Sequence, residues 1–375
     1  MQEKSTQLSD TVIEAWLRLT LVSGVGPRIL AALIAQFHSP QAVLNAAEEE
    51  LRQVEGVGPQ LARAIATADR TTDPAAEWAV CQQEQIQVLA QTADDYPQSL
   101  LEIPDPPGVL FLQGELKSAD SIAIAVVGSR NTTRYGLAQA ERLAGGLARA
   151  GITVVAGLAR GIDAAAHRAA LAAGGRTLAV LGGGLLKIYP PEHADLAGEI
   201  SKQGCLLSEM PPRFVATRNS FPRRNRLISG LTLGTVIVEA GERSGALITA
   251  RFAMEQNRDV FAVPGPIDSR NSKGCHALIR DGAILVESVD DVLDALGPLA
   301  ESNRQEDGRE IRHPSELQLN TMETNVLQSI GSDPTLVDQI VEKTGLPASR
   351  VLSTLSVLEV RKLITRLPGG RVARR

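Results

Sequence analysis

The residues best suited to binding chemistry lie in one short stretch near the middle of the sequence. Between Arg213 and Arg226 the chain carries five arginines and no acidic residue, although its formal net charge is −5. The forked guanidinium of arginine matches phosphate oxygens, and Phe221 and Tyr189 offer aromatic faces on which a base can stack. This pattern favours a phosphate-rich polyanion as the ligand. The alternative is a solvated, cationic helix start with Phe221 in the core.

Three glycine turns add a second kind of anion chemistry. They are Gly128-Ser129-Arg130, the stretch 157–161 with Arg160, and Gly182-Gly183-Gly184. Backbone N–H groups exposed where a helix begins bind phosphate. Neither G-x-G-x-x-G nor G-x-x-x-x-G-K-[ST] occurs at these turns, so we expect no nicotinamide cofactor, no other cofactor and no ATPase activity. Glycines that only make tight turns are the alternative.

The elements that must position these turns lie between about residues 120 and 297. Short apolar, β-branched runs alternate there with alanine-rich helical segments at 136–150, 161–173 and 245–257. Continuously apolar strands separated by helices are typical of a parallel sheet covered on both faces. The pattern predicts a Rossmann-like, doubly wound α/β fold whose ligands bind at the carboxyl ends of the strands. The apolar run 109–112, which precedes this region, is expected to pack against it.

Residues 1–72 carry a possible repeat. Gly24-Val25-Gly26-Pro27 and Gly56-Val57-Gly58-Pro59 each precede an amphipathic stretch. A tight glycine turn followed by proline in the first helical turn is a helix-start signal. The repeat resembles a helix-hairpin-helix (SAM-like) domain, whose turn amides can contact phosphate. A purely structural helical domain is the equal alternative, because few basic residues flank the turns.

The C-terminal part divides into a linker and a small domain. Residues 298–318 are polar, charged and without apolar periodicity, which is typical of a linker. Beyond the linker, the pattern predicts three short helices, at 322–331, 335–344 and 348–360. A hairpin around Gly369-Gly370 is expected to follow them. This pattern predicts a winged helix at 319–375. The expected domains are therefore 1–72, 73–297 with its lead-in, and 319–375.

Composition limits the class of protein. The 375 residues are 43% hydrophobic and 22% charged, which is ordinary globular usage. No apolar run approaches the roughly 20 residues of a membrane helix, and the first ten residues lack the apolar core of a secretory signal. The three cysteines show no metal-ligand spacing and indicate a reducing compartment. We therefore expect a cytoplasmic protein with no membrane partner and no metal site.

The motifs together closely resemble the DNA-processing protein A (DprA) family. They include Gly128-Ser129-Arg130, the G-x-A-R-G-I-D run at 157–163, Phe221-x-x-Arg224-Asn225-Arg226, and S-G-x-L-x-T-A at 244–250. The resemblance covers about residues 120–290. It implies a protein of bacterial natural transformation that binds and protects single-stranded DNA, loads the RecA recombinase onto it, and has no catalytic turnover. It also implies a homodimer formed through the α/β domain.

By the same resemblance, the DNA-binding residues would come from the glycine turns, the arginine-rich stretch and the motif that begins at Ser244. No catalytic or metal-binding residue is implied. The expected DNA-binding residues are Gly128, Ser129, Arg130, Gly157, Arg160, Gly161, Gly183, Arg218, Phe221, Arg224, Asn225, Arg226, Ser244 and Gly245.

An enzyme is the rival interpretation. Gly234-Thr235 followed by Glu239 loosely resembles the catalytic stretch of nucleoside 5′-monophosphate phosphoribohydrolases, and Arg251 is a possible partner for Glu239. The spacing differs by one residue, and the preceding Pro-Gly-Gly of that family is missing. Asp163 and His167 share one helix face at i,i+4, and we expect this pair to fix a glycine turn rather than to catalyse. A transcription regulator based on the winged helix alone is the weakest interpretation.

Overall fold

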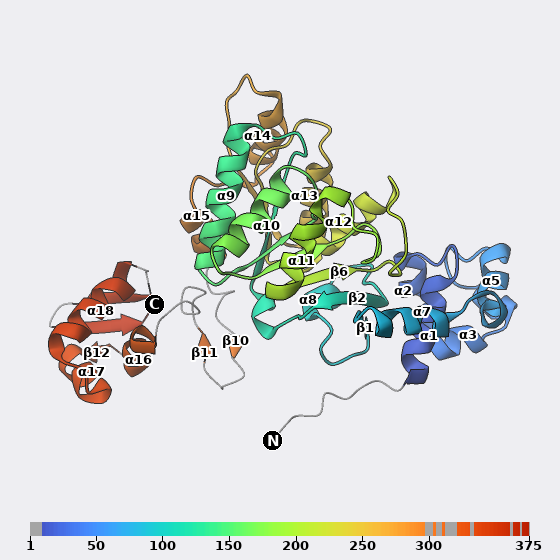
Figure 1. The fold of residues 1–375 in the computed structure, drawn as a ribbon, viewed down its shortest axis with the longest axis horizontal. Coiled ribbons are helices and arrows are strands. Elements are labelled where there is room, and N and C mark those ends of the chain that lie inside the picture. The colour runs from blue at the N-terminus through green and yellow to red at the C-terminus, as the bar shows by residue number, and fades with distance from the viewer. Residues whose placement is uncertain are drawn as a thin grey trace.

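The structure, a computed structural model, describes residues 10–296, 303–304, 310–311, 321–330, 334–360, 363–367 and 370–374. Most of the predicted linker and Gly369 of the predicted hairpin lie outside these residues. Within the linker, β10 (Asn303–Arg304) and β11 (Glu310–Ile311) pair antiparallel. Figure 1 shows the arrangement of the elements.

The central feature is a nine-stranded sheet with the order β1-β2-β6-β5-β4-β3-β7-β8-β9. All the pairings from β6 to β9 are parallel, which confirms the predicted doubly wound fold. The strands are β1 (Gln87–Ala90), β2 (Val109–Gly114), β3 (Ala123–Val127), β4 (Thr153–Ala156), β5 (Thr177–Val180), β6 (Cys205–Ser208), β7 (Gly234–Ile237), β8 (Asp259–Ala262) and β9 (Ile284–Leu285).

The sheet extends beyond its parallel part. The run 109–112 packs as predicted, since it forms most of the buried strand β2, but β2 pairs antiparallel with β6 and with β1. The sheet is therefore mixed at this edge. Antiparallel edge strands on parallel sheets are common, and the short apolar run does not reveal the direction of pairing.

Helices bury both faces of the sheet. Successive residues of a strand point to opposite faces, so each strand contributes side chains to both cores. In β3, Ala123 and Ala125 face one apolar cluster, and Ile124 and Val126 face another. The first face is covered by helices α12, α13 and α14, and the second by α9, α10 and α15. The helical segments of this region are α8 (Gln98–Leu101), η1 (Ser118–Ser121), α9 (Arg134–Arg149), α10 (Ile162–Ala172), η2 (Pro191–His193), α11 (Ala194–Gln203), α12 (Ser220–Gly230), α13 (Gly245–Glu255), η3 (Arg270–Ser272), α14 (Lys273–Arg280) and α15 (Val289–Leu296).

The N-terminal helices follow the predicted repeat. Helices α2 and α5 begin at Pro27 and Pro59, and each is preceded by a glycine N-cap. Gly24 and Gly56 have positive φ, as the tight turns require. The helices are α1 (Asp10–Leu21), α2 (Pro27–Phe37), α3 (Pro40–Asn45), α4 (Glu48–Leu51), α5 (Pro59–Ala66), α6 (Ala68–Thr71) and α7 (Pro74–Gln83).

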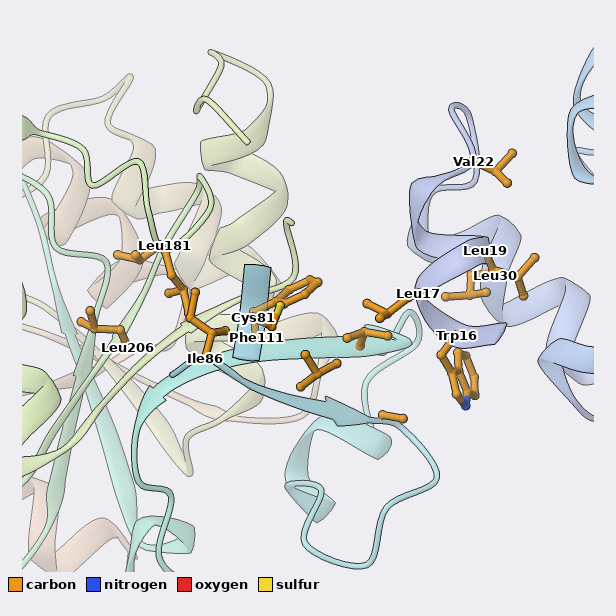
Figure 2. Packing of buried hydrophobic residues seen from close by; sticks show 14 of the residues in the cluster. Trp16, Leu17, Leu19, Val22, Leu30, Cys81, Ile86, Phe111, Leu181 and Leu206 are labelled. Atoms are coloured by element: carbon orange, nitrogen blue, oxygen red, sulfur yellow. The ribbon is translucent and has the colours of Figure 1, made fainter. Parts of the chain in front are cut away.

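The helical segment shares a core with the sheet. Trp16 and Leu17 of α1 belong to the same buried cluster as Phe111 of β2 and Leu206 of β6, and Figure 2 shows this cluster from α1 across to the sheet. Burying large apolar side chains from both sides stabilises the contact. The helical segment is therefore packed onto the edge of the sheet rather than tethered to it.

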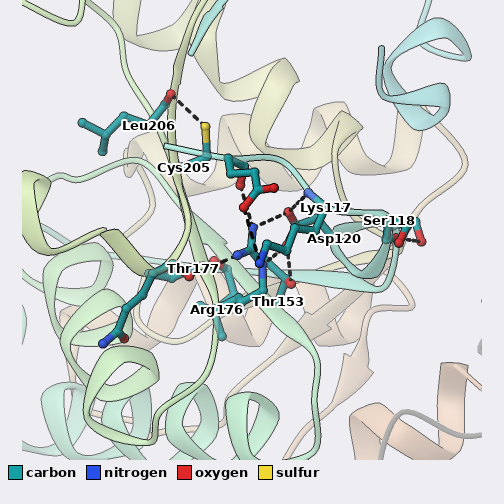
Figure 3. A network of polar contacts seen from close by, with 12 residues as sticks. Lys117, Ser118, Asp120, Thr153, Arg176, Thr177, Cys205 and Leu206 are labelled. Atoms are coloured by element: carbon teal, nitrogen blue, oxygen red, sulfur yellow. Dashed lines mark hydrogen bonds and ion pairs between the residues drawn. The ribbon is translucent and has the colours of Figure 1, made fainter. Parts of the chain in front are cut away.

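A polar network closes the amino-terminal end of the sheet. The buried carboxylate of Asp120 accepts hydrogen bonds from Thr153 and from Arg176, at 2.8 Å and 2.7–2.8 Å, and from the Lys117 amide. Arg176 also donates to the Glu115 carbonyl oxygen. Figure 3 shows how this network joins the segment before β3 to the starts of β4 and β5. Its acceptors are already occupied, so it serves the fold and leaves the opposite end of the sheet for ligands.

The C-terminal region forms the predicted winged helix. Three helices pack with a three-stranded sheet of order β12-β14-β13 around their own buried cluster. Among the described helices of the chain, none is long and apolar enough to cross a membrane. The elements of the winged helix are α16 (Thr321–Ser329), β12 (Thr335–Leu336), α17 (Val337–Thr344), α18 (Ala348–Val360), β13 (Ile364–Leu367) and β14 (Arg371–Arg374).

Candidate nucleic-acid interface

A large cavity opens where the strand order reverses. The chain runs outward from β3 through β4 and β5 to β6, and then returns to place β7 on the other side of β3. In open α/β sheets, ligands bind at the carboxyl ends of strands at such a switch point. A cavity of about 730 Å³ lies there, and we call it the arginine pocket. It is lined by Val127, Gly128, Ser129, Arg130, Asn131, Ala159, Asp163, Tyr189, Arg218, Phe221, Pro222, Arg224, Asn225, Ile228, Gly241, Arg243, Ser244, Gly245, Ala246, Ile248, Thr249 and Asn271.

The side chains that line the pocket carry mostly positive charge. Four arginines line it, and Arg130, Arg218 and Arg243 are exposed to solvent. The one carboxylate among the lining residues belongs to Asp163, which is buried. Three exposed guanidinium groups around one cavity form a site for an anion with several charges, because each can offer paired N–H donors to phosphate oxygens.

Two aromatic rings meet at the edge of the pocket. The ring centres of Tyr189 and Phe221 are 5.4 Å apart, and their planes are inclined by 49°. The guanidinium carbon of Arg130 lies 5.1 Å from the centre of the Phe221 ring, within the range of a cation–π contact. Tyr189 is 44% exposed and Phe221 is half-buried. Phe221 is therefore not a closed core residue, since it lines an open cavity.

A smaller opening adjoins the arginine pocket at these rings. Its lining includes Arg130, Tyr189 and Phe221, which it shares with the larger cavity, together with Gly157 and Arg160. The exposed guanidinium of Arg160 thus stands beside the aromatic pair, next to the main cavity. The two openings therefore meet at the side chains that they share.

Arg224 forms the buried floor of the pocket. Its Nη1 donates to the carbonyl oxygen of Gly157 at 2.8 Å and also to that of Val180. A Cβ at Gly157 would lie 2.3 Å from the Arg224 Nη2, so any larger residue there would have to displace this buried guanidinium. Burial lowers the pKa of Arg224 to about 10, while neighbouring Asp163 favours its charged form. Most of the hydrogen-bonding capacity of this guanidinium is used inside the fold.

Asp163 fixes the second glycine turn. Its Oδ2 accepts the backbone N–H of Gly157 at 2.9 Å. Burial raises the pKa of this carboxyl, and the nearby Arg224 opposes that change. His167 does not join Asp163; its Nδ1 contacts Thr177 Oγ1 at 2.7 Å. The expected turn-fixing role therefore falls to Asp163 alone.

The first and second glycine turns pack directly on each other. Gly161 has φ +77°, and a Cβ there would meet the Ser129 carbonyl oxygen at 2.3 Å. The Ser129 carbonyl also accepts the N–H of Ile162 at 3.3 Å. Gly161 thus sets the spacing between the two turns, and it does not line either opening.

Two of the expected residues lie away from the pocket. Arg226 is 2% exposed and pairs with the Glu209 carboxylate at 2.5 Å and with Asp105 at 3.4 Å. The third glycine turn is packed against the segment before α12. The Gly184 amide donates to the Phe214 carbonyl oxygen at 2.9 Å, and Gly183 lies against Ala216. In this structure Arg226 and Gly183 serve the fold. The other expected residues, apart from Gly161, line one or both openings.

The suggested catalytic pair is not assembled. Glu239 is buried, and its carboxylate accepts hydrogen bonds from Thr132 Oγ1 (2.6 Å), Thr133 Oγ1 (2.6 Å) and the Thr133 amide (2.9 Å). These bonds hold the carboxylate at the start of α9. Arg251 is exposed, and the described part of the chain shows no hydrogen bond or ion pair between it and Glu239. The described residues also contain no cluster of three or more metal-ligating side chains.

Sequence reasoning missed Asn131, Arg243 and Asn271, three polar residues that line the pocket. Arg243 lies in the turn between β7 and α13, directly before the expected Ser244 and Gly245. Asn271 Nδ2 donates to the Asn131 carbonyl oxygen at 3.0 Å, and this bond joins two distant loops at the rim. The place of Arg243 after a parallel strand was a usable signal. Asn271 lies far along the chain and gave none.

Comparison with known proteins agrees with this architecture. Residues 87–297 match the profile of the family described as DNA recombination-mediator protein A. Residues 311–370 match the DprA winged helix domain, and residues 17–68 match a SAM-like helix-hairpin-helix tandem. Fold and site define a doubly wound α/β protein with an arginine-lined switch-point pocket, set between a helix-hairpin-helix segment and a winged helix.

The chain belongs to the DprA family. Protein Smf of Escherichia coli (strain K12) is 38% identical over 370 residues, which cover 96% of this chain and 95% of that protein. The DNA processing protein DprA of Streptococcus pneumoniae is 46% identical over 200 residues, which cover 53% of this chain and 71% of the relative.

Two solved structures resemble the fold. The X-ray structure of Streptococcus pneumoniae DprA has a TM-score of 0.66 and 35% identity, and the match covers 75% of this chain and 97% of that one. The Helicobacter pylori protein, described for its unique single-stranded DNA binding mode, has a TM-score of 0.51 and 29% identity over 56% of this chain and 95% of that one. The family and fold expected from the sequence are confirmed.

Proposed function

We propose that this protein binds single-stranded DNA in the arginine pocket. The observation that carries the proposal is the cluster of exposed Arg130, Arg218 and Arg243 around a cavity that also presents the rings of Phe221 and Tyr189. Proteins that bind single strands combine positive groups along the phosphate backbone of the DNA with aromatic rings that stack on its bases. The Helicobacter pylori relative, described as binding single-stranded DNA, supports this assignment.

The aromatic pair favours a single strand over a duplex. Bases in a duplex stack on one another, so their faces are not free for Phe221 or Tyr189. Unpaired bases offer those faces without an unstacking cost. An arginine cluster beside aromatic rings serves contacts with the DNA backbone and base stacking rather than the reading of base edges, so we expect weak sequence preference.

The test of this function is a gel-shift comparison of an oligonucleotide with its duplex at several salt concentrations. We expect tighter binding of the single strand, and affinity that falls as salt rises with a slope of about −0.7 per phosphate contact. Equal affinity for the duplex, or an affinity independent of salt, would overturn the proposal.

We further propose that the protein protects incoming DNA during natural transformation and loads the RecA recombinase onto it in the cytoplasm. Family membership supports this role. RecA activity on a strand first covered by single-strand-binding protein would measure loading. We expect this chain to speed the onset of RecA-dependent ATP hydrolysis, and an unchanged lag would contradict the proposal.

We propose that the protein acts without catalytic turnover. The carboxylate of Glu239 is occupied by Thr132 and Thr133 and makes no hydrogen bond or ion pair with Arg251 in the described part of the chain, which speaks against N-glycosidic bond cleavage. Incubation with nucleoside 5′-monophosphates is expected to release no free base. Release of base that is lost in Glu239→Gln would favour the enzyme instead.

A homodimer is the assembly we propose. The edge strand β9 exposes two apolar side chains, Ile284 (37% exposed) and Leu285 (43% exposed). An open strand edge with apolar residues is a natural pairing surface. Sedimentation is expected to show a dimer, and Leu285→Lys is expected to shift it towards monomer.

A further inference from the structure

Beside the proposed DNA site, the guanidinium of Arg160 forms an ion pair with the carboxylate of Glu192. Arg160 Nε contacts Glu192 Oε1 at 2.5 Å, and the two side chains are 53% and 50% exposed. Glu192 lies in η2, directly after the Tyr189-Pro190 pair. The hydrogen bond from Arg160 lowers the pKa of Glu192, and the same contact raises the pKa of Arg160. Both groups are therefore charged at neutral pH.

The position of this ion pair relates it to the aromatic rings. Arg160 lines the small opening together with Tyr189, Phe221 and Arg130, and the last three also line the arginine pocket. In the proposed binding mode, a base stacked on these rings would place a neighbouring phosphate near Arg160, which lines the same opening. A carboxylate and a phosphate present the same kind of oxygen pair to a guanidinium, so the two compete for Arg160.

We propose that Glu192 is an internal stand-in for a DNA phosphate, which a phosphodiester group must displace from Arg160 when the strand binds. The inference rests on the proposed single-strand function and deepens it. Glu192 is a positioning residue that lowers affinity, because it satisfies Arg160 before DNA arrives. Because the Arg160–Glu192 pair is neutral overall, a phosphate that displaces Glu192 gains no net neutralisation, and this contact adds little to the salt dependence of the wild-type protein.

The test is a titration of full-length protein with a fluorescently labelled oligothymidine, followed by anisotropy at several salt concentrations. Glu192→Gln is compared with wild type and with Glu199→Gln, an exposed carboxylate on α11 that lines neither opening. The second change removes the same charge elsewhere. Arg160→Gln, alone and combined with Glu192→Gln, completes a double-mutant cycle.

We expect Glu192→Gln to raise affinity about two- to fivefold at low salt, the range that an exposed ion pair of this kind supplies. The salt slope should steepen by about 0.7, one phosphate contact. The gain should vanish in the Arg160→Gln background. A gain no larger than that of Glu199→Gln, or one that persists without Arg160, would overturn the inference. Failure of the wild-type protein to bind the oligothymidine would instead overturn the proposed function.

Discussion

The guanidinium carbon of Arg130 lies 5.1 Å from the ring centre of Phe221, so one side chain combines phosphate chemistry with the ring that is placed to stack on a base. The two residues come from different turns, one after β3 and one at the start of α12. Their contact ties the backbone-binding and base-binding parts of the pocket together. A strand that uses one of them is therefore positioned to use the other.

Removing the Phe221 ring is expected to weaken binding more than folding. Phe221→Ala should cost about 1–3 kcal/mol of DNA-binding free energy, the range for one stacked base. Phe221→Tyr keeps the ring and should bind nearly as wild type. Anisotropy titrations and melting temperatures measure the two effects separately. A large fall in melting temperature with unchanged affinity would show that Phe221 is a core residue.

Arg218 and Arg243 are expected to contribute phosphate contacts from the rim of the pocket. Each alanine substitution should cost about 1.5–3 kcal/mol of binding free energy and make the salt slope shallower by about 0.7. Arg168→Ala, on the outer surface of α10, removes an exposed arginine that lines neither opening and should leave both quantities unchanged. An effect of Arg168→Ala equal to that of Arg243→Ala would mean that binding follows net charge, without a defined site.

Replacing Arg224 is expected to lower the free energy of unfolding of the protein. Arg224→Met leaves the carbonyl oxygens of Gly157 and Val180 without their donor, at a cost of about 1–3 kcal/mol for each unpaired group. Urea unfolding of Arg224→Met and of Arg218→Met compares the same chemical change at a buried and an exposed position. Equal unfolding free energies for the two variants would contradict the buried role.

His167 makes stability depend on pH in a defined direction. Burial, aided by Arg224, lowers the pKa of His167 to about 3 in the folded protein, below the value near 6.5 of an unfolded chain. The unfolded state therefore binds more protons between these values. The contribution of His167 is full above pH 6.5 and is lost as pH falls, by up to about 1.4 kcal/mol per pH unit. Unfolding free energies of wild type and His167→Gln between pH 7.5 and 4.5 should diverge in slope, and parallel curves would contradict this.

Sequence patterns predicted the elements well and their long-range contacts poorly. The starts of α2 and α5 at Pro27 and Pro59 follow from local turn chemistry. Arg224 and Arg226 look alike in the sequence, yet one forms the pocket floor and the other pairs with Glu209. Their difference arises from residues far along the chain, which local spacing does not encode.

Photo-crosslinking of a 5-iodouracil-substituted single strand to the full-length protein, with peptide mapping by mass spectrometry, tests directly whether DNA binds in the arginine pocket. We expect crosslinks to the peptides that contain Phe221 and Tyr189, whose ring centres lie 5.4 Å apart at the pocket edge, and we expect unlabelled single strand to compete them away. Crosslinks confined to the helix-hairpin-helix segment at 17–68 or to the winged helix at 311–370 would contradict it.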